Sequence, residues 1–527
     1  MRQCILFALT MVLLCGCTLV KYASIQEAYS RAQRTEPRQK NLKHMIDQET
    51  YYVIGRALDE TCDCPSASLA IAAYSDKFQK NELVDVMFFT NAGTHFGLNL
   101  PAGIYQLIIF MDSNHNSMFE NNEIVGQKIV TLNKITAPDN VIDKVEIALN
   151  TPITISEIES VAKTTEIKSQ ESFFFPSGTI RSFDDEIFET GMGTLGMYEP
   201  AAFLDKAKTL FFALEEDVPY KIPVVFVHGI GGSVRQFKPI VDKLDRNRYK
   251  PWFFYYPSGS DLNQLAKTFY SVFLSGQVAR LDETPLIIVA HSMGGLVVRE
   301  AINQYENNEK ENTIALLFTI ASPLNGHTAA ALGEKHSFIV LPAWRDLNPG
   351  NPFIKNLFRK SLPESINYQL LYAYNNISTL KFGENSDGVV TLSSQLRREA
   401  QDQATEQFGF DDTHSGILEN DHAIDYILNA IYQVKGPYPE SHLEILFKGG
   451  YDLPEDPSID PLSRYIIRIS GRYMSALVDG EIESIHPLQT QFINSAKGNI
   501  KAATDLEKSW IIFQQKYPEL INSSSSR

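Results

Sequence analysis

The chain has 527 residues, of which 44% are hydrophobic and 21% are charged, and its formal net charge is −16 at pH 7. At about 150 residues per domain this length predicts roughly three folding units, and the composition is globular rather than disordered, collagen-like or coiled-coil. A nucleic-acid binder needs a basic surface, and no stretch of the sequence is dense in lysine and arginine. We therefore expect no nucleic-acid partner or substrate.

The first seventeen residues have the features of an export signal. Arg2 precedes an apolar run at 5–14, which ends in a Leu-Cys-Gly-Cys sequence at 14–17. A charged start, an apolar core of about ten residues and a small-residue exit are typical of a secretory signal, and the run is shorter than a membrane span of about 20 residues. The alternatives are an ordinary secretory signal and a short buried helix.

The ending of this run also resembles a bacterial lipobox. The resemblance implies cleavage between Gly16 and Cys17 and lipid attachment to Cys17, whose acyl chains would hold the protein on a membrane. An acidic residue directly after the lipidated cysteine would resemble an inner-membrane retention signal. The residue at this position is Thr18, which is not acidic. We therefore expect an exported bacterial lipoprotein of the cell envelope, in the outer membrane in preference to the inner membrane.

The texture of the sequence changes twice along the chain. From Tyr51 to about Asn150, short β-rich runs alternate with turn residues, which predicts a small β-sandwich. Between about 172 and 435, apolar strands alternate with helical patterns, which predicts a mainly parallel sheet with helices on both faces. We expect further helices near Tyr465–Val478 and Ile500–Tyr517. The predicted division is a signal at 1–16, a tether at 17–50, a β-sandwich-like domain at 51–150, a linker at 151–171, an α/β domain at 172–435 and a partly helical extension at 436–527.

The candidate catalytic residues of the α/β region begin at two junctions, each between a predicted strand and the segment that follows it. The apolar run at 222–227 leads into His-Gly-Ile-Gly-Gly, and the run at 285–289 leads into Ala-His-Ser-Met-Gly-Gly, after which apolar residues recur at helical spacing. A serine on a tight turn between a buried strand and a helix is the setting of a nucleophile elbow. Because the turn is strained, it needs small residues two positions either side of Ser292. Gly294 meets this need, and Ala290 adds one methyl group.

In this order the two motifs resemble the α/β-hydrolase superfamily, on its lipase and PGAP1-like serine esterase side. The resemblance covers about Phe173 to Val434. It implies that the α/β domain, which follows the predicted all-β sandwich-like domain, is an α/β-hydrolase domain. It also implies a substrate that is an acyl ester, of lipid or lipid-like kind. It also implies the chain order serine, acid, histidine, so the acid and the base follow Ser292.

The best acid and base lie in two loops after that serine. Asp387 follows a strand-like run in a sequence that resembles the acid turn of lipases, and Glu384 is the alternative. His414 stands in a segment that resembles the histidine loop of the family, before an amphipathic helix predicted at 424–434; His422 in the first turn of that helix is the alternative. The histidines that follow the acid are His414, His422, His442 and His486.

These residues define a division of labour. A serine hydroxyl is a poor nucleophile near neutral pH, so His414 would take the proton of Ser292 while Asp387 holds the imidazole in place. The oxyanion would be bound by the backbone N–H of Met293, at the positive end of its helix, and by that of Ile230, as the resemblance to lipases implies. The histidine that begins the His-Gly motif is expected to position its loop and to carry no catalytic proton.

Two weaker signals lie in the β-rich region. Residues 112–123 imitate a calcium loop, with oxygen ligands at positions 1, 3, 5, 9 and 12 and a carbonyl from Met118. Ser117 stands where the turn favours glycine, so a polar hairpin loop is the alternative and no metal is assigned. Cys62 and Cys64 leave open a strained local disulfide or half of a metal site. The calcium ligands would be Asp112, Asn114, Asn116, Glu120 and Glu123.

The sequence therefore predicts a membrane-anchored serine hydrolase of acyl esters that needs no metal or organic cofactor. The alternatives are a non-catalytic binding lipoprotein on a hydrolase scaffold and an acyltransferase with the same triad. The segment 324–365 lies between two predicted strands. It is either a lid over the acyl pocket or a crossover helix with its loop.

Overall fold

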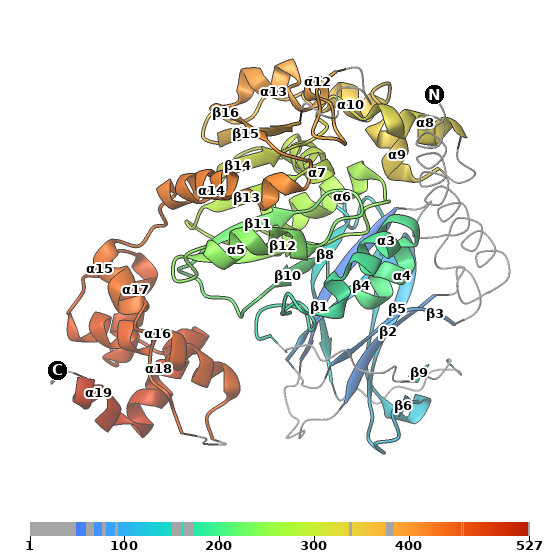
Figure 1. Ribbon diagram of the computed structural model, residues 1–527. Coiled ribbons are helices and arrows are strands. Elements are labelled where there is room, and N and C mark those ends of the chain that lie inside the picture. Colours follow the sequence, from blue (N-terminus) through green and yellow to red (C-terminus); the bar gives the residue numbers. More distant parts are fainter. Residues whose placement is uncertain are drawn as a thin grey trace, which may run out of the picture. The chain divides into compact units, whose positions relative to one another are not determined.

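The computed structural model describes most of the chain beyond the N-terminal region. The predicted signal and Cys17, nearly all of the tether, Cys62, Cys64 and most of the predicted linker lie outside the described residues. The chain divides into two compact units, of which the first ends at Lys435 and the second comprises Val218–Lys221 and Gly436–Arg527 (Figure 1). The described residues are 49–58, 68–75, 81–89, 93–149, 158, 161–162, 172–336, 340–375, 384–454, 456 and 458–524.

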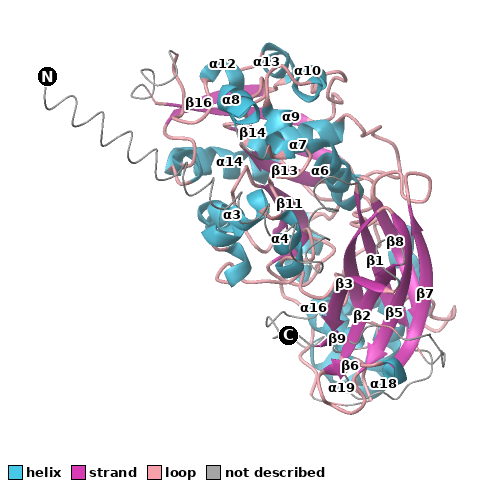
Figure 2. Cartoon of the chain, turned by 90° about the vertical axis from the view of Figure 1, so that its right-hand side faces the viewer, coloured by secondary structure: helices cyan, strands magenta, loops and turns pink. Residues whose placement is uncertain are grey.

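The N-terminal part of the first unit is a sandwich of two sheets (Figure 2). Val53 and Leu98 from one sheet and Ile71 and Leu107 from the other are fully buried in a shared core. This confirms the predicted all-β sandwich-like domain. The antiparallel sheet has the order β3 (Glu82–Phe89), β2 (Leu69–Ser75), β5 (Gly103–Met111), β7 (Ile124–Leu132). The other sheet has the order β4 (His95–Pro101), β1 (Thr50–Leu58), β8 (Val141–Ala148), with β1 antiparallel to β4 and parallel to β8.

A short ribbon extends the sandwich. Strand β6 (Met118–Phe119) pairs antiparallel with β9 (Val161–Ala162), and the ring of Phe119 stacks on that of Phe88 with centroids 5.7 Å apart. Strand β9 lies within the predicted linker at 151–171. This part of the linker is thus a strand packed on the β-rich region.

The rest of the first unit is built on a seven-stranded sheet in which neighbouring strands are parallel except for β10 and β12. Strand β11 has β12 on one side and β13 on the other, so the strand order reverses around it. In open α/β sheets, ligands bind at the carboxyl ends of the strands at such a point. The order is β10 (Phe211–Ala213), β12 (Tyr249–Phe254), β11 (Ile222–Val227), β13 (Leu286–His291), β14 (Ile314–Ile320), β15 (Asn367–Tyr374), β16 (Glu406–Asp411).

Helices cover both faces of this sheet (Figure 2). Strands β11 and β13 are buried along their whole length, which explains why their sequences are continuous apolar runs. Helix α6 (Leu262–Phe269) packs on α7 (Met293–Ile302), and α5 (Lys238–Lys243) packs on α14 (Asp421–Gln433). This mainly parallel sheet with helices on both faces confirms the predicted α/β-hydrolase domain. The other helices are α3 (Thr190–Tyr198), α4 (Pro200–Lys206), α12 (Leu392–Gln395) and α13 (Arg398–Gln403), with a π-helical turn at Tyr270–Leu274 and 3₁₀ turns at Asn121–Glu123, Glu186–Phe188, Val234–Phe237 and Gly416–Leu418.

The segment 324–365 folds into short helices instead of one crossover helix. Its backbone is fixed at the carboxyl edge of the sheet, because Ala343 N donates to the carbonyl of Gly259 at 3.2 Å. His327 Nε2 donates to the carbonyl of Val389 at 2.8 Å, beside the predicted acid loop. The segment therefore lies at the edge of the sheet where the site is predicted. Its helices are α8 (Thr328–His336), α9 (Pro342–Leu347) and α10 (Pro352–Asn356).

The second unit is helical. Its core includes Met474, Leu477, Trp510 and Phe513, all nearly inaccessible to solvent. The helices expected near 465–478 and 500–517 correspond to α16 (Pro461–Asp479) and α18 (Asp505–Lys516). The remaining helices are α15 (Glu440–Leu446), α17 (Pro487–Ala496) and α19 (Pro518–Ser524). Within the described ranges, none of the helices has the length and apolar character that crossing a membrane requires.

Candidate active site

Ser292 stands at the tight turn between β13 and α7. Its backbone has φ 55° and ψ −129°, a conformation that non-glycine residues rarely adopt, and only 6% of its surface is exposed. A Cβ at Gly294 would lie 2.7 Å from the carbonyl oxygen of His228, so this position must be glycine. Ala290 is fully buried in β13 and is accommodated without glycine. The serine therefore has the strained strand-turn-helix setting that the sequence predicts.

A chain of hydrogen bonds joins this serine to the predicted base and acid. Nε2 of His414 lies 2.9 Å from Oγ of Ser292, and its Nδ1 lies 2.6 Å from Oδ2 of Asp387. Because an ionised carboxylate only accepts, Nδ1 of His414 donates to Asp387, which leaves Nε2 of the neutral ring to accept the serine proton. The structure thus brings together three residues that are spread over 122 positions of the chain.

The acid is held by its own loop. The backbone N–H groups of Val389 and Val390 donate to Oδ1 of Asp387 at 2.8 and 2.6 Å, and Nε2 of Gln395 donates to Oδ2 at 3.2 Å. The Asp387 carbonyl in turn accepts from the backbone N–H of His414 at 2.9 Å. These donors stabilise an ionised carboxylate and fix its direction. Gln395 has no motif in the sequence that would have identified it.

The alternatives considered from the sequence lie elsewhere. Glu384 is exposed and accepts a hydrogen bond from the hydroxyl of Ser393 at 2.8 Å. His422 is exposed in the first turn of α14. His442 and His486 belong to the second unit. Among the candidates, the geometry joins only Asp387 and His414 to the serine.

A further histidine, not assigned a role from the sequence, supports the base. Nε2 of His291 donates to the backbone carbonyl of His414 at 2.8 Å, and its Nδ1 accepts from Nε2 of Gln236 at 3.1 Å. Burial, aided by the charge of a protonated His414, lowers the pKa of His291 to about 3, so the ring stays neutral. Its adjacency to Ser292 was visible in the sequence, but its contacts with distant residues were not.

The His-Gly loop after β11 faces the same turn. A Cβ at Gly229 would lie 2.9 Å from Oγ of Ser292, so the loop approaches the serine closely. The amide of Gly231 donates to the hydroxyl of Ser258 at 2.8 Å and that of Gly232 to a carbonyl within the loop at 3.1 Å. Among residues 230–232 of the described chain, the amide of Ile230 is the one that donates no hydrogen bond.

His228 anchors this loop. Its Nδ1 donates to the carbonyl of Gly229 at 2.7 Å, its Nε2 accepts from the amide of Tyr256 at 3.3 Å, and the two rings stack with centroids 4.2 Å apart. Burial lowers the pKa of His228 to about 4. Both ring nitrogens are therefore engaged in a neutral ring, which fits the positional role expected from the sequence. The amide of Met293 opens α7 and is one of the helix N–H groups without an intrahelical partner.

The loop at 112–123 satisfies its carboxylates internally. Asp112 accepts from the amides of Asn116 and Ser117, both at 3.1 Å, and Oε1 of Glu123 accepts from the amide of Ser113 at 2.9 Å. Glu120 is exposed. In the part of the chain that the structure describes, no group of three or more His, Cys, Asp or Glu side chains is arranged to hold a metal ion.

The strand order, the strained serine turn and the helices on both faces define an α/β-hydrolase fold, the fold class of many lipases and esterases. The sequence model of the PGAP1-like alpha/beta domain family matches residues 262–339, the stretch that contains this turn. The predicted resemblance to that family is thus confirmed for this part of the chain.

Solved structures to which the chain is similar include lipases from bacteria and fungi. The mature lipase BlEst2 of Bacillus licheniformis is 19% identical, with 42% of this chain and 97% of that one covered at a TM-score of 0.34. Lipase B of Aspergillus fumigatus is 16% identical, covering 48% and 61% at a TM-score of 0.30. Phospholipase PlaB of Legionella pneumophila is 18% identical, covering 33% and 45% at 0.28. Among curated proteins, no match was found.

Proposed function

We propose that the first unit is a serine hydrolase that cleaves carboxylic esters, with Ser292 as nucleophile, His414 as general base and acid, and Asp387 as the residue that orients the imidazole. The observation that carries this proposal is the unbroken hydrogen-bond chain from the serine hydroxyl to the buried carboxylate. A purely structural histidine does not require a strained serine at the carboxyl end of a buried strand.

The proposed reaction has two halves. Oγ of Ser292 attacks the ester carbonyl while Nε2 of His414 takes its proton, and the resulting oxyanion accepts hydrogen bonds from the amides of Met293 and Ile230. The C–O bond of the ester then breaks, and the alcohol leaves with the proton from His414. Water repeats the sequence on the acyl-enzyme and releases the acid.

We propose lipids or lipid-like esters as the substrate class. The chain carries short helices α8, α9 and α10 at the carboxyl edge of the sheet, where a lid over an acyl pocket would lie. Two side chains at this edge, Leu332 of α8 and Val389 of the acid loop, are exposed apolar groups. Such groups favour contact with an apolar substrate.

A series of p-nitrophenyl esters from C2 to C16 tests this function. We expect Ser292→Ala to lower kcat by at least about 10⁴-fold, since the nucleophile and its base act as one unit. Ser475→Ala removes a hydroxyl from a helix of the second unit and is expected to leave the rate unchanged. Activity of Ser292→Ala above a tenth of the wild-type rate would exclude this serine. Product analysis with an added alcohol separates hydrolysis from acyl transfer.

We further propose that Cys17 anchors the protein to the bacterial outer membrane through its lipid. A net charge of −16 is repelled by an anionic lipid surface, so attachment would depend on acyl chains and not on electrostatics. Cys17→Ala, if exported, is expected to leave the membrane fraction and to keep its activity on small soluble esters. Retention of Cys17→Ala in the membrane after a high-salt wash would show that the lipid is not the anchor.

A further inference from the structure

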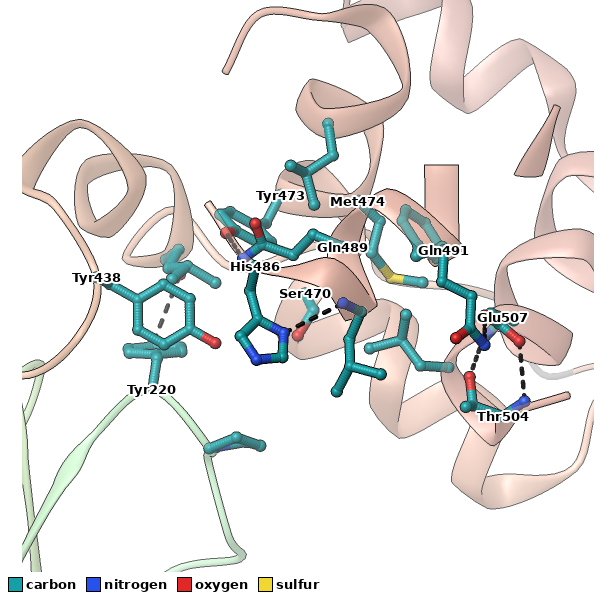
Figure 3. Close-up of a pocket in the computed structure, with 16 residues that line it drawn as sticks. Tyr220, Tyr438, Ser470, Tyr473, Met474, His486, Gln489, Gln491, Thr504 and Glu507 are labelled. Carbon is teal, nitrogen blue, oxygen red and sulfur yellow. Dashed lines mark hydrogen bonds between the residues drawn. The ribbon is translucent and has the colours of Figure 1, made fainter. Parts of the chain in front are cut away.

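The second unit contains a cavity of its own, separate from the site at Ser292. It has a volume of about 310 Å³, within the range of small-molecule sites, and it lies among α15, α16, α17 and α18 (Figure 3). Most of its wall is apolar or aromatic. Leu446, Met474, Leu477 and Phe492 form the buried part of this wall, and Tyr473 adds an aromatic face.

The polar groups of the wall are largely paired with one another. Gln489 donates to the hydroxyl of Tyr473 at 3.0 Å, and this hydroxyl lies 2.9 Å from Nδ1 of His442. Gln491 donates to Oε1 of Glu507 at 2.9 Å, while Oε2 of Glu507 accepts two backbone amides, one of them from Thr504 at 2.9 Å. The single carboxylate of the wall is therefore fully satisfied. A ligand would gain little from these groups and must bind mainly through apolar contact.

The ring of His486, which lines the cavity, has one nitrogen that can donate a hydrogen bond to a ligand. His486 is the N-cap of α17, and its Nδ1 accepts the backbone N–H of Leu488 at 3.1 Å. In the neutral ring the proton therefore sits on Nε2. Figure 3 shows His486 well apart from Glu507. A negatively polarised head group at His486 would thus avoid the carboxylate.

The edge of the cavity is also apolar. Leu488 is 60% exposed and Leu506 is 39% exposed, and both line the cavity. Large aliphatic side chains in contact with water at the mouth of an apolar cavity favour an occupant that brings its own apolar surface. The cavity is about twice the volume of the dry engineered cavity of about 150 Å³ that takes up benzene, which corresponds to roughly twelve carbon atoms.

We propose that this cavity binds one medium-length acyl chain, with the acyl oxygen at Nε2 of His486 and the methylene groups along Met474, Leu477 and Phe492. The proposal rests on the wall of the cavity alone and does not depend on ester hydrolysis by the first unit. Free carboxylic acids and acylated lipids share this chemistry. The experiment separates these two sources.

Photo-crosslinking with a diazirine analogue of dodecanoic acid tests the site. The full chain carrying Ser292→Ala is used, so that ester competitors are not consumed, and the label is mapped by mass spectrometry. We expect saturable labelling of peptides from α16 and α17 that excess dodecanoic acid displaces. Wild-type chain is expected to show the same label in this unit, whatever the outcome for Ser292. Labelling confined to the first unit would overturn the proposal.

Two variants localise the label. Ser470 lines the cavity, so Ser470→Trp fills it and is expected to reduce labelling at least 10-fold; Arg468→Trp places the same ring on the exposed side of α16 and is expected to retain it within twofold. Leu488→Asp, at an exposed position that does not threaten folding, is expected to reduce labelling by about 10-fold through repulsion of the carboxylate. Unchanged labelling in both cavity variants would overturn the proposal.

Competitors identify the source of the chain. Displacement by dodecanoic acid but not by a dodecanoyl lysophospholipid supports a free acid as ligand, and displacement by both supports the chain of either source. Equal displacement by dodecane would contradict the hydrogen bond to His486. Failure of all three to displace the label would overturn binding of an acyl chain.

Discussion

Around Ser292 the polar side chains form a chain that ends on one hydroxyl, whereas around the cavity of the second unit they are paired with one another. In the first region, Asp387 receives three donors and passes its orientation through His414 to the serine. In the second, Gln491 and Glu507 satisfy each other. The first arrangement orients the base toward Oγ of Ser292, and the second leaves a cavity wall that is mainly apolar.

The backbone conformation also differs between the two regions, since it is strained at Ser292 and regular in the helices of the cavity wall. Ser292 has a positive φ, which costs on the order of 1–3 kcal/mol, and the lack of a side chain at Gly229 lets the His-Gly loop approach it closely. Three helices of the cavity wall, α16, α17 and α18, each begin with a capping side chain, which is Asp460, His486 and Thr504 respectively. Stored strain marks the region proposed for chemistry, and its absence from these helices fits a region proposed for binding.

The largest expected effect comes from breaking the polar chain at the acid. Asp387→Asn keeps the volume of the side chain but removes the charge that fixes the imidazole, so we expect kcat to fall by about 10⁴-fold with little change in KM. Glu384→Gln is the matched control, because Glu384 is exposed and bonded to a serine outside the chain. If Glu384→Gln loses activity and Asp387→Asn keeps it, the acid is misassigned.

The buried histidines of the first region make its stability depend on pH. Burial lowers the pKa of His291 from 6.5 to about 3, so below pH 6.5 the unfolded chain takes up a proton that the folded chain does not, and the free energy of unfolding falls as pH falls. Between pH 7 and 4.5 this one group contributes on the order of 3 kcal/mol. The pKa of Asp346, raised to about 7 chiefly by burial, acts in the opposite direction.

Urea unfolding at pH 7 and 4.5 measures this contribution. His291→Gln is expected to lose about 3 kcal/mol less stability than wild type over this interval, because the titrating group is gone while Asp346 remains. His422→Gln, on the exposed first turn of α14, should follow wild type. Equal losses in wild type and His291→Gln would mean that His291 titrates normally.

Adding one methyl group at the serine sharpens the comparison further. Gly229→Ala places a Cβ 2.9 Å from Oγ and 2.6 Å from Cβ of Ser292, so either the serine or the loop must shift, and we expect kcat to fall by about 10²-fold. Gly191→Ala in α3 meets no atom within 4 Å and serves as control. Unchanged turnover in Gly229→Ala would show that the loop has room that the structure does not show.

The smallest effect is expected at the loop of residues 112–123. Its buried carboxylates, Asp112 and Glu123, already accept backbone amides, so we expect 1 mM calcium to shift Tm by less than about 1 °C. A rise of about 4 °C or more that Asp112→Asn abolishes would instead establish a calcium site.

Most of the hydrolase fold could be predicted from local patterns in the sequence. The elbow was visible because a buried strand, a small-residue turn and a helix are all encoded within a short stretch around Ser292. Asp387 followed from chain order and from its place after a predicted strand. His414 followed from chain order, from the resemblance of its segment to the histidine loop of the family and from its place before a predicted helix. Gln395, Gln236 and the contacts of His291 were not predictable in this way, because they are tertiary contacts without a local signature.

The second unit shows the same limit. The apolar spacing of α16 was sufficient to predict a helix, but α18 begins at Asp505 and not near Ile500, because Thr504 and Glu507 form a capping box. Helix α17 was not predicted, since its apolar residues are mixed with Thr, Asn and Ser, which have low helix propensity. The cavity arises only when these helices pack, so no single segment predicted it.

Labelling with a fluorophosphonate probe, which reacts with activated serines, tests the central claim most directly. We predict one probe per wild-type chain, mapped to Ser292, and none on Ser292→Ala, with both proteins equally folded by circular dichroism. His414→Gln is expected to label far more slowly, whereas His422→Gln should label as wild type does. Equal labelling of wild type and Ser292→Ala would contradict the account, because the reactive serine would then lie elsewhere.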